Sequence, residues 1–250
     1  MFSGKFVRPS LGAAPKSVMR ADNGRGGVFS PTGSFGFFRG RNLKPDLPGE
    51  SKIKRSLDIA LAIVGIIGFS PLMIAIFFLV RRDGGPAIFS QKRIGKNGEQ
   101  FNCYKFRTMV VDAETVLQAL LKSDAEVRKE WNIDRKLRKD PRITSLGRFL
   151  RRKSFDELPQ LWNVLKGDMS IVGPRPVIAD EIGLYGDNAR FYYLCRPGLT
   201  GLWQVSGRNN VSYEERVALD SQYAQLWSLS QDIRIIGRTF GVVINGDGAH

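Results

Sequence analysis

Histidine is nearly absent from this chain of 250 residues, because the only one is His250, the last residue. This excludes Ser-His-Asp and Cys-His triads, the HExxH zinc site and any imidazole general base in the body of the chain. Cysteine is also scarce: Cys103 and Cys195 are the only thiols, too few for a zinc finger or a disulfide framework. Two scattered thiols fit a reducing cytosolic location. Any acid, base or nucleophile must therefore be a carboxylate, lysine, tyrosine or serine.

Negative charge is in short supply as well, since 38 lysines and arginines face 24 aspartates and glutamates and the formal net charge is +14. So basic a chain is expected to meet an anionic partner: nucleic acid, a phosphorylated metabolite or a membrane surface. Residues 1–50 hold eight basic and three acidic residues among many glycines, serines and prolines. This composition predicts a disordered basic tail that can lie on anionic lipid. The tail lacks the early apolar run of a signal peptide.

One long apolar run, Ile59–Val80, contains no charged residue. At ~1.5 Å per residue, a helix of these 22 residues is long enough to span a hydrocarbon core of roughly 30 Å. Ser70-Pro71 stands at its midpoint, where proline removes a backbone hydrogen bond, and both flanks are basic. These features favour a re-entrant helix–break–helix over residues 51–82, in which the serine hydroxyl satisfies a carbonyl freed by the proline. From the residues alone, a single membrane-spanning helix stays open as the alternative.

Residues 83–250 have the mixed pattern of a small α+β domain that is mostly helical. The segments Ala87–Ile94 and Gln100–Thr108 flank Asn97-Gly98, a pair that predicts the turn of a β-hairpin. Leu202–Val205 is predicted as a short strand. Helices are predicted over residues 113–131, 143–152, 156–166, 177–194, 213–227 and 232–244.

The densest chemical signal is a basic run that leads into the acidic pair Asp156-Glu157. Pro159 predicts that a helix starts at this pair and Gly167 predicts its end, so helix capping is one interpretation of the carboxylates. The other is phosphoryl transfer, because an ionised aspartate can attack phosphorus and a neighbouring acid can hold Mg²⁺. Nearby arginines bind phosphate oxygens, and Arg175 stands between two prolines that hold its backbone rigid. The residues alone leave both interpretations open.

A series of short motifs stands in a fixed order along the chain. They are Lys54-Arg55-Ser56-Leu57-Asp58, Ser70-Pro71, Lys105-Phe106-Arg107-Thr108-Met109, Asp140-Pro141-Arg142-Ile143-Thr144, Leu150-Arg151, Ser154-Phe155-Asp156-Glu157-Leu158-Pro159-Gln160-Leu161, Lys166-Gly167-Asp168-Met169-Ser170 and Gly173-Pro174-Arg175-Pro176. This series resembles the bacterial sugar transferase family, the monotopic phosphoglycosyl transferases, over about residues 52–245. The segment from Arg196 to Asn209 resembles the exopolysaccharide branch, which uses UDP-galactose or UDP-glucose.

The resemblance implies roles for individual residues. Asp156 matches the nucleophile, which attacks the β-phosphate of a UDP-sugar, expels UMP and carries a covalent phospho-sugar. Glu157 matches the Mg²⁺ ligand. Arg151 and Arg175 match arginines that contact phosphate and nucleotide, and Arg107 is a further candidate. Undecaprenyl phosphate then takes the sugar phosphate, which implies ping-pong kinetics.

The resemblance also implies a place in the cell. The helix broken at Ser70-Pro71 is expected to re-enter the cytoplasmic face of the bacterial inner membrane, with residues 83–250 as a cytosolic, membrane-associated catalytic domain. Membrane lipid is an expected partner and nucleic acid is not. The oligomeric state, including a homo-oligomer, and the choice between galactose and glucose are left open. A non-catalytic membrane-anchored adaptor with a basic face is the alternative from another class.

Overall fold

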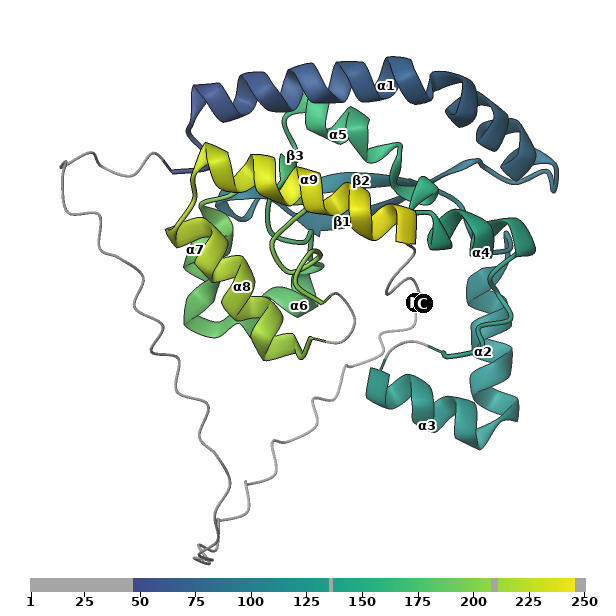
Figure 1. Ribbon diagram of the computed structural model, residues 1–250. Helices are drawn as coiled ribbons and strands as arrows, with labels where there is room; N and C mark the ends of the chain where they lie inside the picture. The colour runs from purple at the N-terminus through teal and green to yellow at the C-terminus, as the bar shows by residue number, and fades with distance from the viewer. Residues whose placement is uncertain (1–46, 135–136, 208–210, 246–250) are drawn as a thin grey trace, which may run out of the picture. The chain divides into compact units, whose positions relative to one another are not determined.

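A computed structural model describes residues 47–134, 137–207 and 211–245. The predicted basic tail therefore lies outside the described residues, except for its last four. The rest is mostly helical with a small β-hairpin, as predicted (Figure 1).

The apolar run forms one continuous helix, α1 (Lys52–Arg81), so the predicted break at Ser70-Pro71 is wrong. The helix passes through Pro71 and is visibly curved (Figure 1). Pro71 has no N–H for the carbonyl of Ile67 four residues earlier. The Ser70 hydroxyl donates to that carbonyl at 2.8 Å, as predicted, and this bond lets the helix continue.

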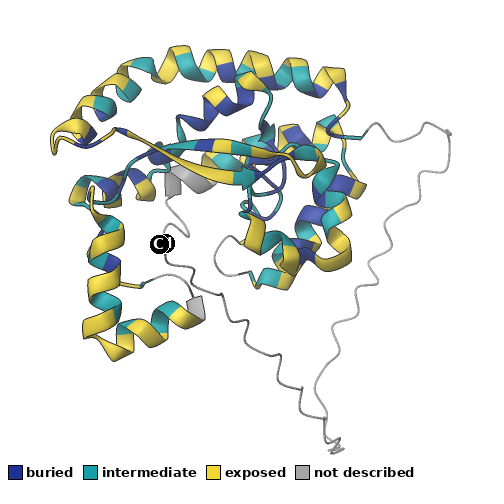
Figure 2. Cartoon of the chain, turned by 180° about the vertical axis from the view of Figure 1, so that it is seen from behind, coloured by how far each residue is buried: buried dark blue, intermediate teal, exposed yellow. Residues whose placement is uncertain are grey.

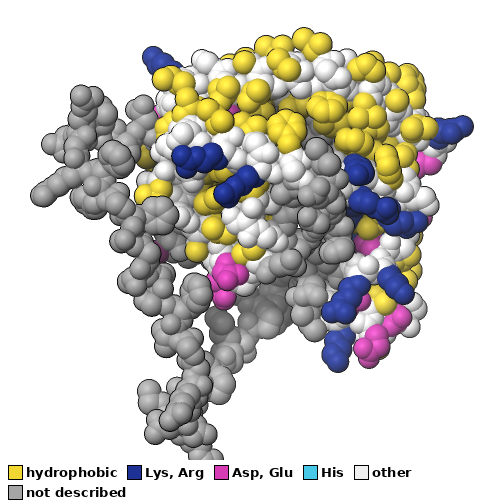
Figure 3. Space-filling view, viewed as in Figure 1, with side chains coloured by type: hydrophobic (Ala, Val, Ile, Leu, Met, Phe, Trp, Pro, Cys, Tyr) yellow, Lys and Arg dark blue, Asp and Glu magenta, His cyan; other side chains and the backbone are white. Residues whose placement is uncertain are grey.

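Most of α1 exposes apolar side chains. Its most apolar 18-residue window has a mean hydropathy of 2.6 and is 11% buried, whereas a core helix of a soluble protein is mostly buried. By length and composition α1 can cross a membrane. Hydrophobic side chains cover it in Figure 3, with Lys and Arg at both ends, and Figure 2 shows the same exposure from behind. The exposed large ones within the apolar run are Ile59, Ile63, Val64, Ile67, Phe69, Ile74, Phe78 and Leu79.

The predicted hairpin is confirmed. Strands β1 (Ile88–Ile94) and β2 (Gln100–Phe106) pair antiparallel, with Gln91 opposite Cys103. Asn97 and Gly98 in the turn η1 (Lys96–Gly98) have φ of 59° and 81°, the left-handed region that the Asn-Gly pair tolerates. The C-terminal part of α1 packs on this hairpin and on α4 (Ser145–Arg152) through a cluster of buried apolar side chains, Ile76, Val80, Ala87, Phe106 and Leu150.

The helix predicted over residues 113–131 is two helices, α2 (Ala113–Ser123) and α3 (Ala125–Asp134). Asp124 between them is extended, and its carboxylate accepts from the N–H groups of Glu126 and Val127 at 2.9 and 3.1 Å. The aspartate therefore caps a new helix rather than continuing the first. The two helices form an arm that extends from α4 (Figure 1).

A second sheet was missed by the sequence analysis. Strand β3 (Ser170–Val172) pairs in parallel with β4 (Gly198–Thr200), and the predicted strand Leu202–Val205 is wrong because this segment is a series of turns. Gly173 explains how close the two segments lie, since a Cβ there would stand 2.3 Å from the carbonyl oxygen of Arg196.

The C-terminal half of the chain is a group of short and long helices. The predicted helix over residues 177–194 is divided into α6 (Ala179–Ile182), η3 (Gly183–Asn188) and α7 (Ala189–Tyr193), because Gly186 leaves helical geometry with φ of 51°. The last two predicted helices are confirmed as α8 (Tyr213–Gln225) and α9 (Leu229–Asn245).

The first turns of α1 are fixed to this domain by the basic-acidic motif at residues 54–58. The buried Lys54 ammonium lies 2.7 Å from Asp232 of α9 and 2.9 Å from the carbonyl of Val172. Arg55 donates to two carbonyls near the end of α5 (Gln160–Lys166), and Asp58 accepts from Ser170 and from the N–H of Ile171. The motif is therefore an anchor between the apolar helix and the rest of the molecule.

Candidate active site

The carboxylate pair lies in a one-turn 3-10 helix that precedes α5 (Gln160–Lys166), and not at the start of α5 itself. Ser154 adopts the left-handed conformation with φ of 55°, and the turn η2 (Phe155–Glu157) follows. Helix α5 begins only at Gln160, with Pro159 as its N-cap, so the predicted helix start at Asp156 is wrong. The predicted end is confirmed, because Gly167 has φ of 95° after the last helical residue. Asp156 is 8% exposed. Its carboxylate therefore lies inside the domain and does not act as the N-cap of α5.

A lysine that was not predicted lies beside both acids. Lys105, near the end of β2, places its Nζ 2.6 Å from Glu157 Oε1 and 4.0 Å from Asp156 Oδ2. In the sequence, Lys105 stands out only as part of the Lys105–Met109 motif. Its signal was weak, because the pairing joins residues about fifty positions apart that only the fold brings together.

Arg151, a predicted site residue, is also brought to Asp156. Its Nε donates to Thr108 Oγ1 at 2.9 Å, which leaves the other guanidinium nitrogens for further acceptors. Burial lowers the pKa of Arg151, while the charges of Asp156 and Asp140 raise it. Burial and the neighbouring Glu157 raise the pKa of Asp156, and the cations Lys105 and Arg151 lower it. Asp156 is thus a desolvated carboxylate between two cations.

Arg107 does not belong to this cluster. Its five N–H groups all donate to protein acceptors: the two carboxylate oxygens of Asp83 at 2.6 and 2.8 Å and the carbonyls of Val80, Pro86 and Met109. A guanidinium used in this way has no donor left for a phosphate. The structure therefore corrects the candidate role of Arg107, which instead ties the end of α1 to the hairpin.

Arg175 and Glu157 line one small hollow next to Asp156. Its floor and walls come from β1, β2, α5 and the two loops around β3 and β4. The lining residues are Arg93, Cys103, Lys105, Glu157, Gln160, Arg175, Pro176, Gly198, Leu199 and Gln204. Three cations therefore face one carboxylate there, which suits a ligand that carries phosphates. Burial lowers the pKa of Arg93, and the charge of Arg175 lowers it further.

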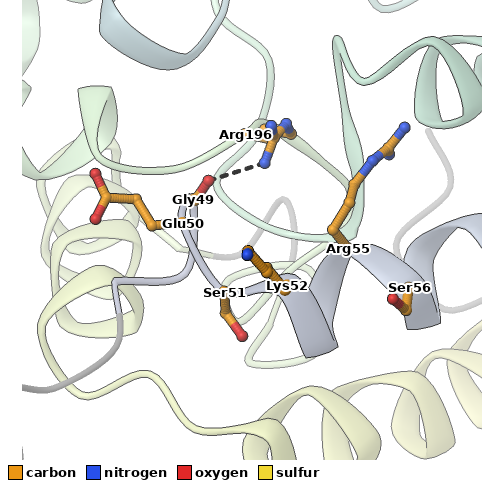
Figure 4. Close-up of a pocket in the computed structure, with 7 residues that line it drawn as sticks. All are labelled: Gly49, Glu50, Ser51, Lys52, Arg55, Ser56 and Arg196. Carbon is orange, nitrogen blue, oxygen red and sulfur yellow. Dashed lines mark hydrogen bonds between the residues drawn. The ribbon is translucent and has the colours of Figure 1, made fainter.

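A second hollow lies at the start of α1 and holds none of the predicted site residues (Figure 4). Arg55 and Arg196 line it, but both guanidiniums bind backbone carbonyls. Arg196 donates to Gly49 and Gly167, each at 2.9 Å, and the first of these bonds is dashed in Figure 4. These arginines hold the turn before α1 and the end of α5 in place. Their structural role accounts for the charges around this hollow without a ligand.

The donor set at Asp156 and Glu157 was tested for Mg²⁺. Across the described ranges, the chain has no group of three or more His, Cys, Asp and Glu side chains able to hold a metal ion. Two adjacent carboxylates nevertheless fit Mg²⁺, which in enzymes of phosphorylated substrates uses one or two carboxylates and takes its other oxygens from phosphates and water. Asp156 and Glu157 are two carboxylates of this kind.

Residues 49–246 match the family described as bacterial sugar transferase. The chain belongs to this family. The chain is 53% identical over 198 residues to the undecaprenyl-phosphate galactose phosphotransferase of Salmonella typhimurium, covering 79% of this chain and 42% of that protein. It is 50% identical over 198 residues to the exopolysaccharide production protein ExoY of Sinorhizobium fredii, covering 79% and 88%. The UDP-glucose:undecaprenyl-phosphate glucose-1-phosphate transferase of Caulobacter vibrioides is 38% identical over 208 residues, covering 79% and 72%.

The match spans only part of several relatives. It covers 42% of the Salmonella protein and 42% of an uncharacterized sugar transferase of Haemophilus influenzae that is 54% identical. Less than half of each of those proteins corresponds to this chain. The named activities belong to those relatives.

Proposed function

We propose that the chain transfers hexose-1-phosphate from UDP-galactose or UDP-glucose to undecaprenyl phosphate and releases UMP, as the first membrane step of exopolysaccharide assembly. The observation that carries this proposal is the buried Asp156 carboxylate between Lys105 and Arg151, beside a hollow lined by cations. The names of the Salmonella, Sinorhizobium and Caulobacter relatives support the substrate classes.

The proposed chemistry has two displacements at one phosphorus atom. An Asp156 oxygen bonds to the β-phosphorus of the UDP-sugar, the bond from that phosphorus to UMP breaks, and the phospho-sugar stays on the aspartate. A phosphate oxygen of undecaprenyl phosphate then bonds to the same phosphorus and the bond to Asp156 breaks. Lys105 and Arg151 offset the negative charge that gathers around the phosphorus, and Arg175 binds the donor from the hollow.

We further propose that Glu157 holds Mg²⁺ together with donor phosphate oxygens, beside the nucleophile Asp156. The ion would supply charge neutralisation at the diphosphate. Lys105 bonds Glu157 at 2.6 Å, so it orients the Glu157 carboxylate beside the nucleophile and adds its own positive charge.

The membrane arrangement is part of the proposal, with α1 re-entrant at the cytoplasmic face of the inner membrane. Support comes from the two ends of α1, which the same compact domain holds. Lys54 fixes the first turn to Asp232, and Arg107 binds the last-turn carbonyl of Val80. A helix that crossed the bilayer would carry these ends to opposite faces. A curved helix that enters one leaflet keeps both ends on one side and brings a lipid-borne acceptor to the site.

Intact-protein mass spectrometry of the detergent-purified protein with Mg²⁺ and either UDP-galactose or UDP-glucose, without undecaprenyl phosphate, tests the proposal. We expect a gain of one hexose phosphate with one donor, and release of UMP. Asp156→Asn should lose the adduct, while Asp187→Asn, which changes an exposed carboxylate, should keep it. The absence of both adduct and UMP with either donor would contradict the proposal and favour the adaptor.

A further inference from the structure

Arg175 at the donor hollow rests on a buried tryptophan. Its guanidinium carbon lies 5.4 Å from the centre of the Trp203 ring, within the range of a cation–π contact. Trp203 is 7% exposed, and its Nε1 has no acceptor among the described residues. Among the described residues, the indole makes its contact through the ring face and not through a hydrogen bond. It offers a fixed surface to whatever packs on it.

The same ring carries a second arginine. Arg216, in the first turns of α8, places its guanidinium carbon 5.4 Å from the Trp203 centre and 5.0 Å from that of Tyr213. Its Nε and Nη2 are buried and have no acceptor in the described part of the chain. A buried guanidinium with unpaired donors is costly, so this placement needs another reason.

Asp220, one helical turn beyond Arg216, supplies the opposite charge. It is 1% exposed, and its Oδ2 accepts from the Tyr185 hydroxyl at 2.8 Å, while Oδ1 has no partner among the described residues. Residues spaced by four on a helix can pair directly, and these two leave donor and acceptor atoms unpaired instead. Burial raises the pKa of Asp220 to about 7, while the Tyr185 hydrogen bond, the charge of Arg216 and the backbone N–H of Arg175 oppose this rise.

The loops around the ring allow little movement. Gly201 lies two residues before Trp203. A Cβ on Gly201 would stand 2.2 Å from the carbonyl oxygen of Gly173, so this segment packs closely against the loop that leads to Arg175. The charge of Arg93, which also lines the hollow, is close enough to Arg175 that the two guanidiniums repel each other. Arg175 is therefore bounded by a like charge and by an aromatic surface.

We propose that Arg216, with Asp220 as its counter-charge, is a positioning residue that fixes Arg175 at the donor hollow through the shared Trp203 ring. This inference rests on the proposed function, because it assigns Arg175 to the diphosphate of the sugar nucleotide. Arg216 keeps the ring in place and Asp220 keeps Arg216 in place, so the Arg175 guanidinium meets the diphosphate without losing further rotamer freedom.

The test is the rate of adduct formation in single turnovers, measured against the concentration of the donor that the wild type uses. Arg216→Met should raise the half-saturating donor concentration about tenfold and lower the limiting rate less than threefold. Arg216→Lys keeps the charge on the ring and should restore most of the affinity. Arg190→Met is the matched control, since Arg190 stacks on Phe191 at 4.7 Å on exposed surface of α7 and should change neither value.

A double-mutant cycle separates positioning from a general loss of structure. If Arg216 acts through Arg175, adding Arg216→Met to Arg175→Ala should weaken donor use by less than a further twofold. Independent effects that multiply, or an unchanged half-saturating concentration in Arg216→Met, would overturn the inference. If Arg216→Met does not fold, the same cycle with Asp220→Asn, which removes the proposed counter-charge of Arg216, decides, since a loss that multiplies with Arg175→Ala overturns the inference equally. A wild type that forms no adduct refutes the proposed function itself, and the inference falls with it.

Discussion

Two buried aspartates organise two polar clusters, and they differ in how fully their oxygens are bonded. Asp232 on α9 receives Lys54 and Trp227 at one oxygen and Tyr223 at the other, at 2.7 to 3.0 Å. Asp220 on α8 receives Tyr185 at one oxygen, while its other oxygen has no partner in the described part of the chain.

The difference shows two roles. The cluster at Asp232 is an anchor that holds α1 to the domain, and the cluster at Asp220 is a support for Arg175. The cluster at Asp232 joins α1 to β3, α8 and α9. The cluster at Asp220 includes Arg216, which packs on the Trp203 ring as Arg175 does. It leaves polar atoms unpaired among the described residues. Unpaired buried polar atoms destabilise a fold, so they are expected where function needs a charge more than stability does. Changes at the first cluster should therefore affect stability, and changes at the second should affect donor use.

The largest effect is expected at the anchor. Lys54→Met leaves Asp232 buried without its ion-pair partner, which should cost about 3–5 kcal/mol of unfolding free energy. Thermal unfolding in detergent measures the loss. Lys52→Met, at an exposed position two residues earlier, is the control and should unfold like the wild type. Equal unfolding temperatures for Lys54→Met and the wild type would remove the basis for calling this cluster an anchor.

The support cluster at Asp220 should make the stability of the protein depend on pH. Burial raises the pKa of Asp220 from an ordinary 3.8 to about 7, against the opposing effects of Tyr185 and Arg216. The folded protein binds the proton of the Asp220 carboxyl more tightly than the unfolded chain does. The stability that this proton contributes is therefore complete below about pH 4 and is lost as the pH rises through about 7. The shift corresponds to a few kcal/mol. The other groups facing Asp220 are Arg175, Tyr192, Cys195 and Tyr213.

Asp220→Asn should therefore unfold at nearly the same temperature at pH 8 as at pH 5, while the unfolding temperature of the wild type falls between these values. Asp187→Asn, an exposed carboxylate, should follow the wild type. A parallel fall in Asp220→Asn would show that another group carries the dependence.

Local chemistry made part of this architecture predictable. The Asn97-Gly98 turn, the Gly167 helix end and the bond from Ser70 to the carbonyl freed by Pro71 each depend on neighbours within a few residues. Their outcome follows from backbone geometry, so the sequence is enough.

Contacts between distant segments were not predictable in the same way. The pairing of β3 with β4 joins residues 170 and 198, and Lys105 reaches acids about fifty positions away. Arg107 is an example of a false prediction with the same cause. Its place in a motif suggested a phosphate ligand, and only the fold shows that all five of its N–H groups bind protein acceptors. The Asp156 pair was found from its neighbours, but its burial between two cations needed the fold.

Arg107 offers a smaller test at the other end of α1. Arg107→Lys keeps the charge but loses the paired bonds to Asp83 and most of the carbonyl bonds, which should cost about 1–2 kcal/mol of unfolding free energy. Donor use should not change, because no donor of Arg107 is left for phosphate. The same single-turnover assay measures this, with Arg151→Lys as the contrasting variant whose rate should fall. A clear rise in half-saturating donor concentration in Arg107→Lys would return Arg107 to the site.

The smallest effect is expected at Ser70. Ser70→Ala removes the bond to the Ile67 carbonyl, which Pro71 leaves without its backbone donor, and should cost about 0.5–1.5 kcal/mol. The cost should be larger in lipid bilayers than in detergent if this carbonyl lies in hydrocarbon, because water cannot replace the lost donor there. Ser70→Thr keeps a hydroxyl and should restore the bond. Comparing unfolding temperatures of the three proteins in nanodiscs and in detergent measures the difference. An equal loss in both would contradict the expected difference and give no support for this carbonyl lying in bilayer hydrocarbon.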